Sequence, residues 1–395
     1  MRRTVRRGVR ALLIAHVLLA AGVACADGGL PRVLAAYYIW YTDGEDHADP
    51  WRHWTRAEVR PLHGERNPLA LPGDPPLAST AYPLAGLYAS RDPDVAEWHM
   101  RLARSAGIDA FLVSWWGGNQ GTDATFAGTT LPAAERTGFK VALLDELAQF
   151  HRDHEAYARG LAAALKRFAA SEAYLRIDGR PVVYLYQVAK DPGLDPAAFG
   201  LVRGIVEEQV GPVWWIVDKI AHDHASRSPD RRKHIPAAWL AAEGVDAFAV
   251  YSTFSNFRAH AYADVIAEYR HLADQAHRAG RRIVLPVHPG HDNSRYRADG
   301  YVMPRRDGDT LRDYLRAATD AGADAVLVTS WNEWPETTVV EPARNWDDPY
   351  LPLRIIAAWR GRDFRPEPAP PATRRGADAS PESGAPALDP APGSR

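Results

Sequence analysis

The stretch Val326-Leu-Val-Thr-Ser-Trp-Asn-Glu-Trp-Pro-Glu336 decides the fold that this sequence predicts. It begins as an apolar, β-branched run, which is typical of a strand buried on both faces of a parallel sheet. Pro335 has no N–H to donate to a neighbouring strand, so we expect the strand to stop near Trp334. Glu333 and Glu336 then lie at the C-terminal end of a strand, which is where α/β barrels carry their chemistry.

Seven more apolar runs precede this stretch, and together they make eight predicted strands. Each run but the last is followed by a segment able to form a helix. Strand and helix alternating to eight predict an α/β fold, a (β/α)8 TIM barrel, although no internal repeat is evident in the sequence. The predicted strands cover residues 33–38, 108–115, 140–144, 181–186, 213–217, 245–251, 283–287 and 325–331.

Helix ends and long loops support this barrel. Asp92 followed by Pro93 predicts an N-cap with proline at the first helical position, and Gly107 predicts the end of that helix. Helices are also predicted over residues 156–170 and 310–321, the latter closing at Gly322. Long loops follow the first and seventh strands, over residues 39–91 and 288–309, and we expect both to border the same mouth as the two glutamates.

Composition and charge narrow the class of protein. The chain has 395 residues, of which 46% are hydrophobic and 24% charged, and its net charge is -2 with a pI near 6.7. This balance gives no electrostatic reason to expect binding to nucleic acid. The thirteen tryptophans and sixteen tyrosines provide flat rings that suit the apolar faces of sugars, although large barrels also use many aromatics in packing.

The two ends of the chain are predicted to lie outside the folded domain, which we place at about residues 30–365. Residues 1–26 have the basic start, short apolar core and small-x-small site of a signal peptide, which predicts export to the periplasm or beyond and no stable membrane span. Cys25 leaves lipid anchoring open as an alternative. Because it is the only cysteine, no disulfide or thiol nucleophile is expected in the mature protein. Residues 366–395 are Pro/Ala-rich and are predicted to be a disordered tail.

Two carboxylates three residues apart, among tryptophans at a barrel mouth, favour glycosidic bond cleavage. That reaction needs one acid and one base or nucleophile on either side of the bond. The other interpretation is that both are helix-capping or salt-bridged surface acids. The histidine pairs at 151/154 and 222/224 lack a third ligand at suitable spacing, so neither a metal site nor a cofactor is expected.

The sequence contains motifs at residues 37–41, 51–54, 86–93, 106–116, 289–297, 331–336 and 341–343. In their order and spacing they resemble glycoside hydrolase family 99, the endo-α-mannosidase/endo-α-mannanase family, over most of residues 33–345. The resemblance implies that Glu333 is the base that takes the proton from the sugar's 2-hydroxyl, which then forms a 1,2-anhydro sugar. It implies that Glu336 protonates the leaving oxygen and later activates water.

The same resemblance implies a set of substrate-binding residues. Glu146 is implied to contact the sugar that is cleaved, with a solvated loop acid as the alternative, and Tyr186 and Tyr251 line the same site unless they only pack the barrel. One of Trp115 and Trp116 should point into the barrel by alternation. The remaining candidates are Tyr41, Trp54, His291, Arg295, Trp331 and Trp334.

Two departures from the family pattern follow the first glutamate. The family usually continues Trp-His-Glu-Gly-Thr, whereas this chain has Trp334-Pro-Glu-Thr-Thr338. Pro335 stiffens the link between the acids and Thr337 replaces a glycine, so activity is either altered in its subsite preference or lost. The expected partner is an α-mannoside-containing oligo- or polysaccharide and the expected state is a monomer. The alternatives are a family-99-like protein of polysaccharide assembly and a non-catalytic carbohydrate-binding barrel.

Overall fold

The computed structural model describes residues 32–46, 48, 50–55, 74–118, 121–146, 153–186, 194–218, 233–253, 261–295 and 297–370. The predicted signal peptide, most of the predicted tail, and the histidines at 151, 222 and 224 lie outside these residues. One part of the predicted tail is described, because Glu367 accepts hydrogen bonds on its backbone carbonyl from Trp98 (3.1 Å) and Tyr350 (2.8 Å). The folded domain therefore continues past residue 365.

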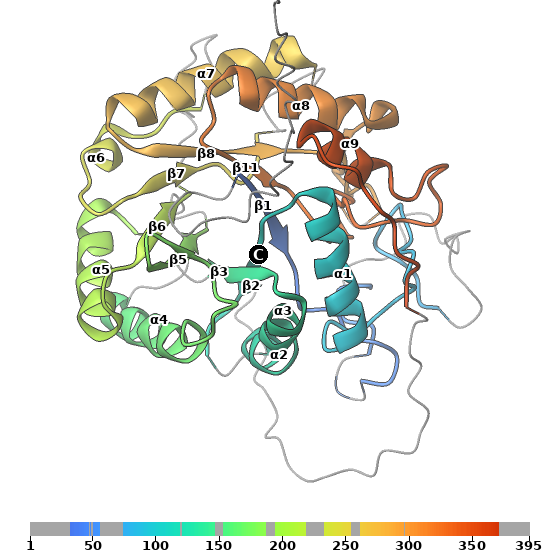
Figure 1. The fold of residues 1–395 in the computed structure, drawn as a ribbon, viewed down its shortest axis with the longest axis horizontal. Helices are drawn as coiled ribbons and strands as arrows, with labels where there is room; N and C mark the ends of the chain where they lie inside the picture. The colour runs from blue at the N-terminus through green and yellow to red at the C-terminus, as the bar shows by residue number, and fades with distance from the viewer. Residues whose placement is uncertain are drawn as a thin grey trace, which may run out of the picture.

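Eight parallel strands close into a barrel, which confirms the predicted fold (Figure 1). Each strand pairs in parallel with the next around the ring, and β1 pairs with the last strand to close it. In ring order the strands are β1 (Val33–Tyr37), β2 (Ala110–Trp115), β3 (Lys140–Asp145), β5 (Arg180–Leu185), β6 (Trp214–Val217), β7 (Ala247–Ala249), β8 (Arg282–Val287) and β11 (Ala325–Val328).

Helices surround the barrel on its outer side (Figure 1). They are α1 (Pro93–Ala106), α2 (Gly121–Thr125), α3 (Leu131–Thr137), α4 (His154–Phe168), α5 (Pro196–Val210), α6 (Ala237–Leu240), α7 (Tyr262–Arg278), α8 (Asp309–Asp320) and α9 (Leu351–Trp359). The expectation that no helix follows the last strand is wrong, because α9 packs its apolar side between α1 and α8.

Short elements decorate this framework. A π-helix, Phe126–Thr130, joins α2 to α3, and a 3-10 turn, Arg306–Gly308, leads into α8. β4 (Arg176–Ile177) pairs antiparallel with β5, and the loop after β8 contains a small hairpin of β9 (His291–Asp292) and β10 (Val302–Met303). The predicted long loops after the first and seventh barrel strands are thus both present.

The predicted ends of α1 are confirmed. Asp92 caps its start by accepting the N–H of Asp94 at 2.9 Å, and Pro93 occupies the first turn. Gly107 ends it in the left-handed region, with φ of 84°. Glycine adopts this conformation without the steric cost that a Cβ brings, so the chain turns at once into β2.

A short repeat that the sequence analysis missed joins neighbouring strands at their starts. The motif Gly-x-Asp-Ala occurs at residues 107–110, 244–247 and 322–325, before β2, β7 and β11. In each copy the aspartate carboxylate accepts a backbone N–H of the adjacent strand at 2.9 Å. The acceptor–donor pairs are Asp109 with Val33, Asp246 with Trp215, and Asp324 with Ile283. These clamps hold the end of the barrel opposite the predicted mouth.

The last barrel strand is shorter than predicted. β11 ends at Val328, and the chain then folds back on itself instead of continuing to Trp334. Ser330 N donates to Thr338 O at 2.8 Å and Glu341 N donates to Trp331 O at 2.9 Å, so residues 330–341 form a compact loop at the barrel's C-terminal end. We call this segment the acid loop, since it carries both predicted catalytic glutamates.

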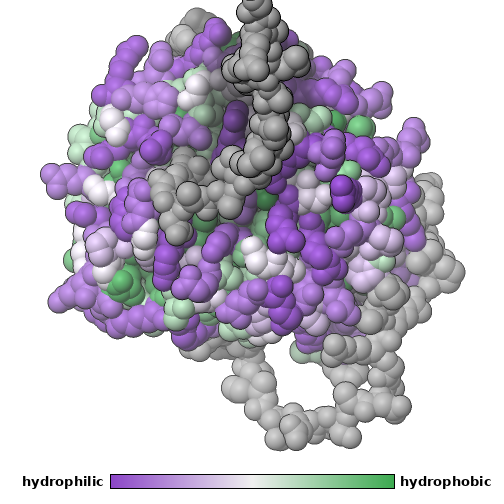
Figure 2. Space-filling model, viewed as in Figure 1, coloured by the Kyte–Doolittle hydropathy of each residue, from purple (hydrophilic) through white to green (hydrophobic). Residues whose placement is uncertain are grey.

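Among the described residues, two large hydrophobic side chains are exposed, Leu201 and Val302. The face in Figure 2 is mostly hydrophilic, with apolar side chains scattered over it. Across the described ranges, no helix combines the length and apolar character needed to cross a membrane.

Candidate active site

The acid loop brings Glu333 and Glu336 to the mouth of the barrel in different environments. Glu333 is buried, with 5% of its surface exposed, and its backbone N–H donates to Ser330 Oγ at 2.7 Å. The Glu336 side chain is 27% exposed, and its Oε2 lies 4.0 Å from His291 Nδ1. One acid is therefore sheltered from solvent while the other reaches it.

A third carboxylate reaches the same mouth from β3. Glu146 follows the last residue of that strand and is 4% exposed. Its Oε1 accepts a hydrogen bond from Ser114 Oγ at 2.9 Å, and Ser114 in turn accepts one from Trp116 Nε1 at 3.2 Å. The interpretation of Glu146 as a solvated loop acid does not fit this burial.

Three tyrosines lie among these carboxylates. The hydroxyls of Tyr38 and Tyr251 are hydrogen-bonded, and the rings of Tyr186 and Tyr251 meet edge-to-face with centroids 4.9 Å apart. Burial, and then the charges of Glu336 and Glu333, raise the pKa of Tyr251 well above its usual value. The hydroxyl therefore stays protonated and able to donate hydrogen bonds at any physiological pH.

The carboxylates also contribute to the raised pKa of the other two tyrosines. Burial raises the pKa of Tyr38, with further contributions from Tyr251, Glu146 and Glu333. Tyr186 is only partly exposed, and burial followed by Glu146, Tyr251 and Glu336 raises its pKa as well. We call these three tyrosines and three carboxylates the mouth cluster.

Aromatic side chains extend the mouth cluster toward solvent. Trp116 and Trp40 are partly exposed, with ring centroids 6.5 Å apart, and Trp40 also stacks on His53 at 4.2 Å and packs on Tyr38 at 4.6 Å. Of these, only Trp116 was among the predicted site residues. Tyr38 was not among the predicted site residues, although strand alternation indicates it. Tyr37 packs outward against α1, so Tyr38, its neighbour on the chain, must face the opposite way.

A buried layer lies beneath the acid loop. Tyr41 and Trp54 are each 2% exposed, and Trp334 is fully buried. The Tyr41 hydroxyl donates to Asn332 O at 2.7 Å and accepts from Trp334 N at 3.1 Å, while the Trp54 ring packs on Tyr41 with centroids 4.3 Å apart. These three predicted residues support the loop that carries the acids.

Two other predicted tryptophans face the helices. Trp115 is 1% exposed and donates from Nε1 to Asp123 of α2 at 3.0 Å. Trp331 is fully buried, with its ring centroid 5.1 Å from Phe111 and 5.5 Å from His99 of α1. Side chains alternate between the two faces of a strand, so the placement of Trp115 follows once Ser114 faces the mouth. We therefore remove both from the candidate substrate-binding set.

The predicted cationic and imidazole groups are divided between the mouth and its rim. His291 is 2% exposed and lies beside Glu336. Arg295 donates from Nε to Leu77 O at 3.3 Å and so joins two loops instead of pairing with either acid. Among the residues that the structure describes, no three His, Cys, Asp or Glu side chains gather as a ligand set for a metal ion.

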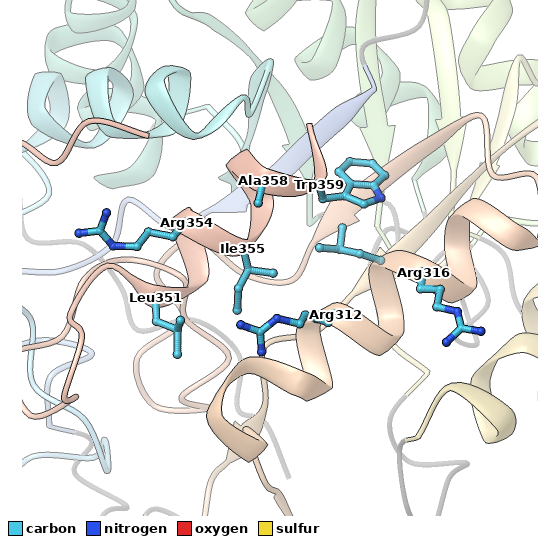
Figure 3. A pocket seen from close by; sticks show the side chains of 8 residues that line it. Arg312, Arg316, Leu351, Arg354, Ile355, Ala358 and Trp359 are labelled. Carbon is cyan, nitrogen blue, oxygen red and sulfur yellow. The ribbon is translucent and has the colours of Figure 1, made fainter. Parts of the chain in front are cut away.

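A groove on the outside of the molecule is separate from the mouth cluster. It lies between α8 and α9, and Figure 3 shows Arg316 and Arg354 pointing away from it on opposite sides. Its three arginines pair with aspartates, Arg312 with Asp309 (2.9 Å), Arg316 with Asp320 (3.7 Å) and Arg354 with Asp348 (2.9 Å). The groove therefore carries balanced charge and offers none of the chemistry found at the mouth.

The mouth of this (β/α)8 barrel holds buried and partly exposed carboxylates, with aromatic rings beside them that can stack on sugars. This combination is typical of one class of protein. That class is the glycoside hydrolases, and comparisons with known proteins agree. The model of "Glycosyl hydrolase family 99" matches residues 31–195, and the model of "Glycosyltransferase WbsX" matches residues 143–353.

Individual relatives span most of the chain. The glycoprotein endo-alpha-1,2-mannosidase of Rattus norvegicus is 24% identical over 348 residues, which cover 82% of this chain and 71% of that protein. The corresponding protein of Xenopus laevis is 23% identical over 337 residues, covering 78% and 69%. The solved GH99 endo-alpha-mannosidase of Bacteroides thetaiotaomicron superposes with a TM-score of 0.64 at 21% identity, covering 84% of this chain and 97% of that one, which shows the shared fold.

The WbsX model covers more than half of the 395 residues, and the two models together span the whole barrel. The chain belongs to the WbsX family and is a glycoside hydrolase of family 99 or a family-99-like protein.

Proposed function

We propose that this protein is an exported enzyme that cleaves internal α-mannosidic linkages with retention of configuration. The observation that carries the proposal is the mouth cluster, in which burial and then partly exposed Glu336 and buried Glu333 and Glu146 all raise the pKa of Tyr251, whose hydroxyl is hydrogen-bonded to Tyr38. The choice of an α-mannoside is supported by the endo-alpha-1,2-mannosidase relatives.

The difference in exposure between the two loop acids suits the roles that the family resemblance implies. Glu333 is sheltered, as expected for a base that takes its proton from the 2-hydroxyl of a bound sugar. Glu336 reaches solvent, as expected for a group that protonates the leaving oxygen and then activates water.

The substrate supplies the nucleophile in this mechanism. In an α-mannoside the axial 2-oxygen lies opposite the axial leaving group, so it can displace that group from behind and form a 1,2-anhydro sugar. The protein holds the sugar ring and the two acids in place. The 2-hydroxyl of a ring held in this way is a far more effective nucleophile than a hydroxyl free in solution. Glu146, Tyr251 and Tyr186 are placed to bind that ring, and Trp116 to stack on the next one.

The test is turnover of yeast α-mannan or an α-mannobioside bearing a fluorogenic leaving group. Glu333→Gln and Glu336→Gln should each lower kcat by about 100- to 10,000-fold, the usual contribution of a general acid or base. Glu208→Gln, on the exposed side of α5, is the matched control. Wild-type turnover in both acid variants would refute the assigned roles. Sugar binding without any turnover in the unaltered protein would show a carbohydrate-binding barrel instead.

A second measurement isolates the anhydro-sugar route. A substrate lacking the 2-hydroxyl has no internal nucleophile, so we expect it to bind and not to be cleaved. NMR of the first-formed product should show the α anomer. Cleavage of the 2-deoxy substrate at a comparable rate would exclude this mechanism while leaving hydrolysis itself in place.

A second candidate function is transfer of the sugar to another glycan, as in polysaccharide assembly, and the WbsX match favours it. The chemistry needs no other residues, because Glu336 can activate a sugar hydroxyl in the place of water. Raising the concentration of a mannobiose acceptor separates the two. Hydrolysis predicts mainly shorter products, and transfer predicts longer ones that increase with acceptor.

Localisation and assembly are also part of the proposal. The sequence of residues 1–26 supports cleavage after residue 26 and export. N-terminal sequencing of the protein from the producing cell tests this, and attachment of labelled fatty acid to Cys25 would show lipid anchoring instead. We propose a monomer, to be tested by light scattering.

A further inference from the structure

A fully buried carboxylate lies beneath the acid loop, at Glu341, which is 0% exposed. Its Oε2 accepts from the Tyr88 hydroxyl at 2.7 Å and from Trp334 Nε1 at 3.0 Å. Its Oε1 lies 3.1 Å from His99 Nε2, a close contact without the alignment of a hydrogen bond. Removing a carboxylate from water is costly, and hydrogen-bond donors such as these offset that cost.

Two of these contacts lead to the residues on either side of Glu333. Trp334 follows Glu333 directly. The Tyr88 hydroxyl accepts from Asn332 Nδ2 at 3.2 Å, and Asn332 precedes Glu333. A single carboxylate is therefore connected to both sequence neighbours of the proposed base.

Asn332 is itself attached to the first barrel strand's exit. Its Oδ1 accepts from Tyr38 N at 2.7 Å and its Nδ2 donates to Tyr38 O at 2.8 Å, the pattern of a neighbouring strand. An amide with both groups satisfied by one residue has a single orientation. The position of Glu333 relative to Tyr38 of the mouth cluster thus depends on Asn332, which the Tyr88 hydroxyl joins to Glu341.

The far side of Glu341 is anchored to the helix layer. His99 lies on α1, and its Nδ1 is 3.1 Å from the hydroxyl of Tyr37 on the outer face of β1. The Glu341 backbone N–H also closes the acid loop by donating to Trp331 O. Since Glu341 is enclosed by these groups, it has no access to a substrate.

We propose that Glu341 is a positioning residue, which acts through Tyr88, Asn332 and Trp334 to hold Glu333 where it reaches the sugar's 2-hydroxyl. The proposal rests on the proposed function for the role of Glu333. It predicts that loosening this connection lowers the rate of chemistry and has little effect on substrate binding, because the residues that hold the sugar belong to other strands.

The test compares two tyrosine-to-phenylalanine variants of the full chain. Tyr88→Phe removes the hydroxyl that joins Glu341 to Asn332. Tyr174→Phe removes an equally buried hydroxyl on the barrel wall, which accepts from Leu143 N at 3.2 Å and donates to Val182 O at 2.8 Å. Both should lower the unfolding temperature by similar amounts. Only Tyr88→Phe should lower kcat on the α-mannoside, by about 10- to 100-fold, with KM within about threefold of the wild type.

Hydrogen–deuterium exchange adds a readout that needs no turnover. Peptides covering residues 330–341 should exchange faster in Tyr88→Phe and at the wild-type rate in Tyr174→Phe. If the wild type does not cleave α-mannosides, the proposed function fails, and exchange still decides whether the connection holds the loop. Unchanged exchange, or an unchanged kcat in an active, folded Tyr88→Phe protein, overturns the proposal.

Position 341 supplies an independent pair if Tyr88→Phe does not fold. Glu341→Gln keeps an acceptor oxygen for Tyr88 and Trp334 and has nearly the same size as the carboxylate. We expect its kcat to stay within about threefold of the wild type, whereas Glu341→Leu should lose about 10- to 100-fold. Equal kcat in the two variants would contradict a role that depends on the accepted hydrogen bonds.

Discussion

Thr337, which follows Glu336, has a backbone conformation that L-residues avoid. Its φ is +50°, and for a β-branched residue this is a steric outlier. Its hydroxyl donates to Trp334 O at 3.3 Å and lies 3.1 Å from Thr80 Oγ1, while Arg305 donates to its carbonyl at 3.3 Å. The surrounding loops therefore hold the residue in place against its own preference.

Replacing Thr337 by alanine and by glycine separates the strain from the hydrogen bonds. Alanine loses the hydroxyl and keeps a Cβ in the left-handed region, which costs about 1–2 kcal/mol. Glycine loses both the hydroxyl and the Cβ, but the greater conformational freedom of its unfolded chain lowers the free energy of unfolding by about 0.4–1 kcal/mol. Thr337→Gly should therefore be more stable than Thr337→Ala by about 1 kcal/mol, the difference between these two quantities.

Equilibrium unfolding in urea measures this difference. A control with the opposite sign is Ala163→Gly, on the exposed side of α4, where glycine should be less stable by about 1 kcal/mol. The reasoning is refuted if Thr337→Ala is as stable as Thr337→Gly or more so, because the strained conformation would then have no energetic consequence.

Three further predictions concern pH, the barrel clamps and the tryptophans. Burial raises the pKa of Tyr38 and Tyr251 in the folded state, so the native protein binds more protons than the unfolded chain above about pH 10. The free energy of unfolding should therefore fall above that pH by about 1.4 kcal/mol per pH unit for each tyrosine. The doubly substituted phenylalanine variant should show a shallower fall between pH 10 and 11 in urea unfolding, and equal slopes would contradict this. Asp246→Ala should lower the free energy of unfolding by about 2–4 kcal/mol, because it removes the acceptor of Trp215 N–H and of two Arg180 hydrogen bonds. KM should stay unchanged because these contacts lie far from the mouth, and a changed KM would argue that the clamp and the mouth are not independent. Trp116→Ala should raise KM about tenfold, whereas Trp331→Leu should lower the unfolding temperature and leave KM unchanged; the reverse pattern would restore Trp331 to the substrate-binding set.

The barrel was predictable because its signals are local. Apolar runs of β-branched residues mark strands that are buried on both faces, and Asp92, Pro93 and Gly107 mark the ends of α1 through capping geometry that depends only on nearby backbone. The end of β11 was misplaced because the apolar run continues into residues that are buried by loop packing instead of strand pairing.

The position of the acids at the barrel mouth was easier to predict from the sequence than the orientation of the aromatic side chains. Glu333, Glu336 and Glu146 follow from their places after barrel strands, which topology brings to one end. Whether Trp115 faces the mouth or the helices depends on strand register, and a shift of one residue would reverse it. Trp331 lies beyond the end of β11, so its burial depends on how the acid loop packs. The role of Glu341 depends on partners more than 200 residues away in sequence, such as Tyr88 and His99, and no local pattern indicates them.

The Gly-x-Asp-Ala clamps lie at the end of the barrel opposite the mouth, so their hydrogen bonds involve none of the loops there. Three of the eight strand junctions are secured at the floor by a carboxylate from one strand and an amide from the next. Loops on the opposite rim are then free to lengthen, shorten or be exchanged while the framework keeps its circumference. Because the clamps and the mouth loops lie at opposite ends, this chain is a suitable starting point for exchanging mouth loops to change glycan preference while the clamped end is kept unchanged.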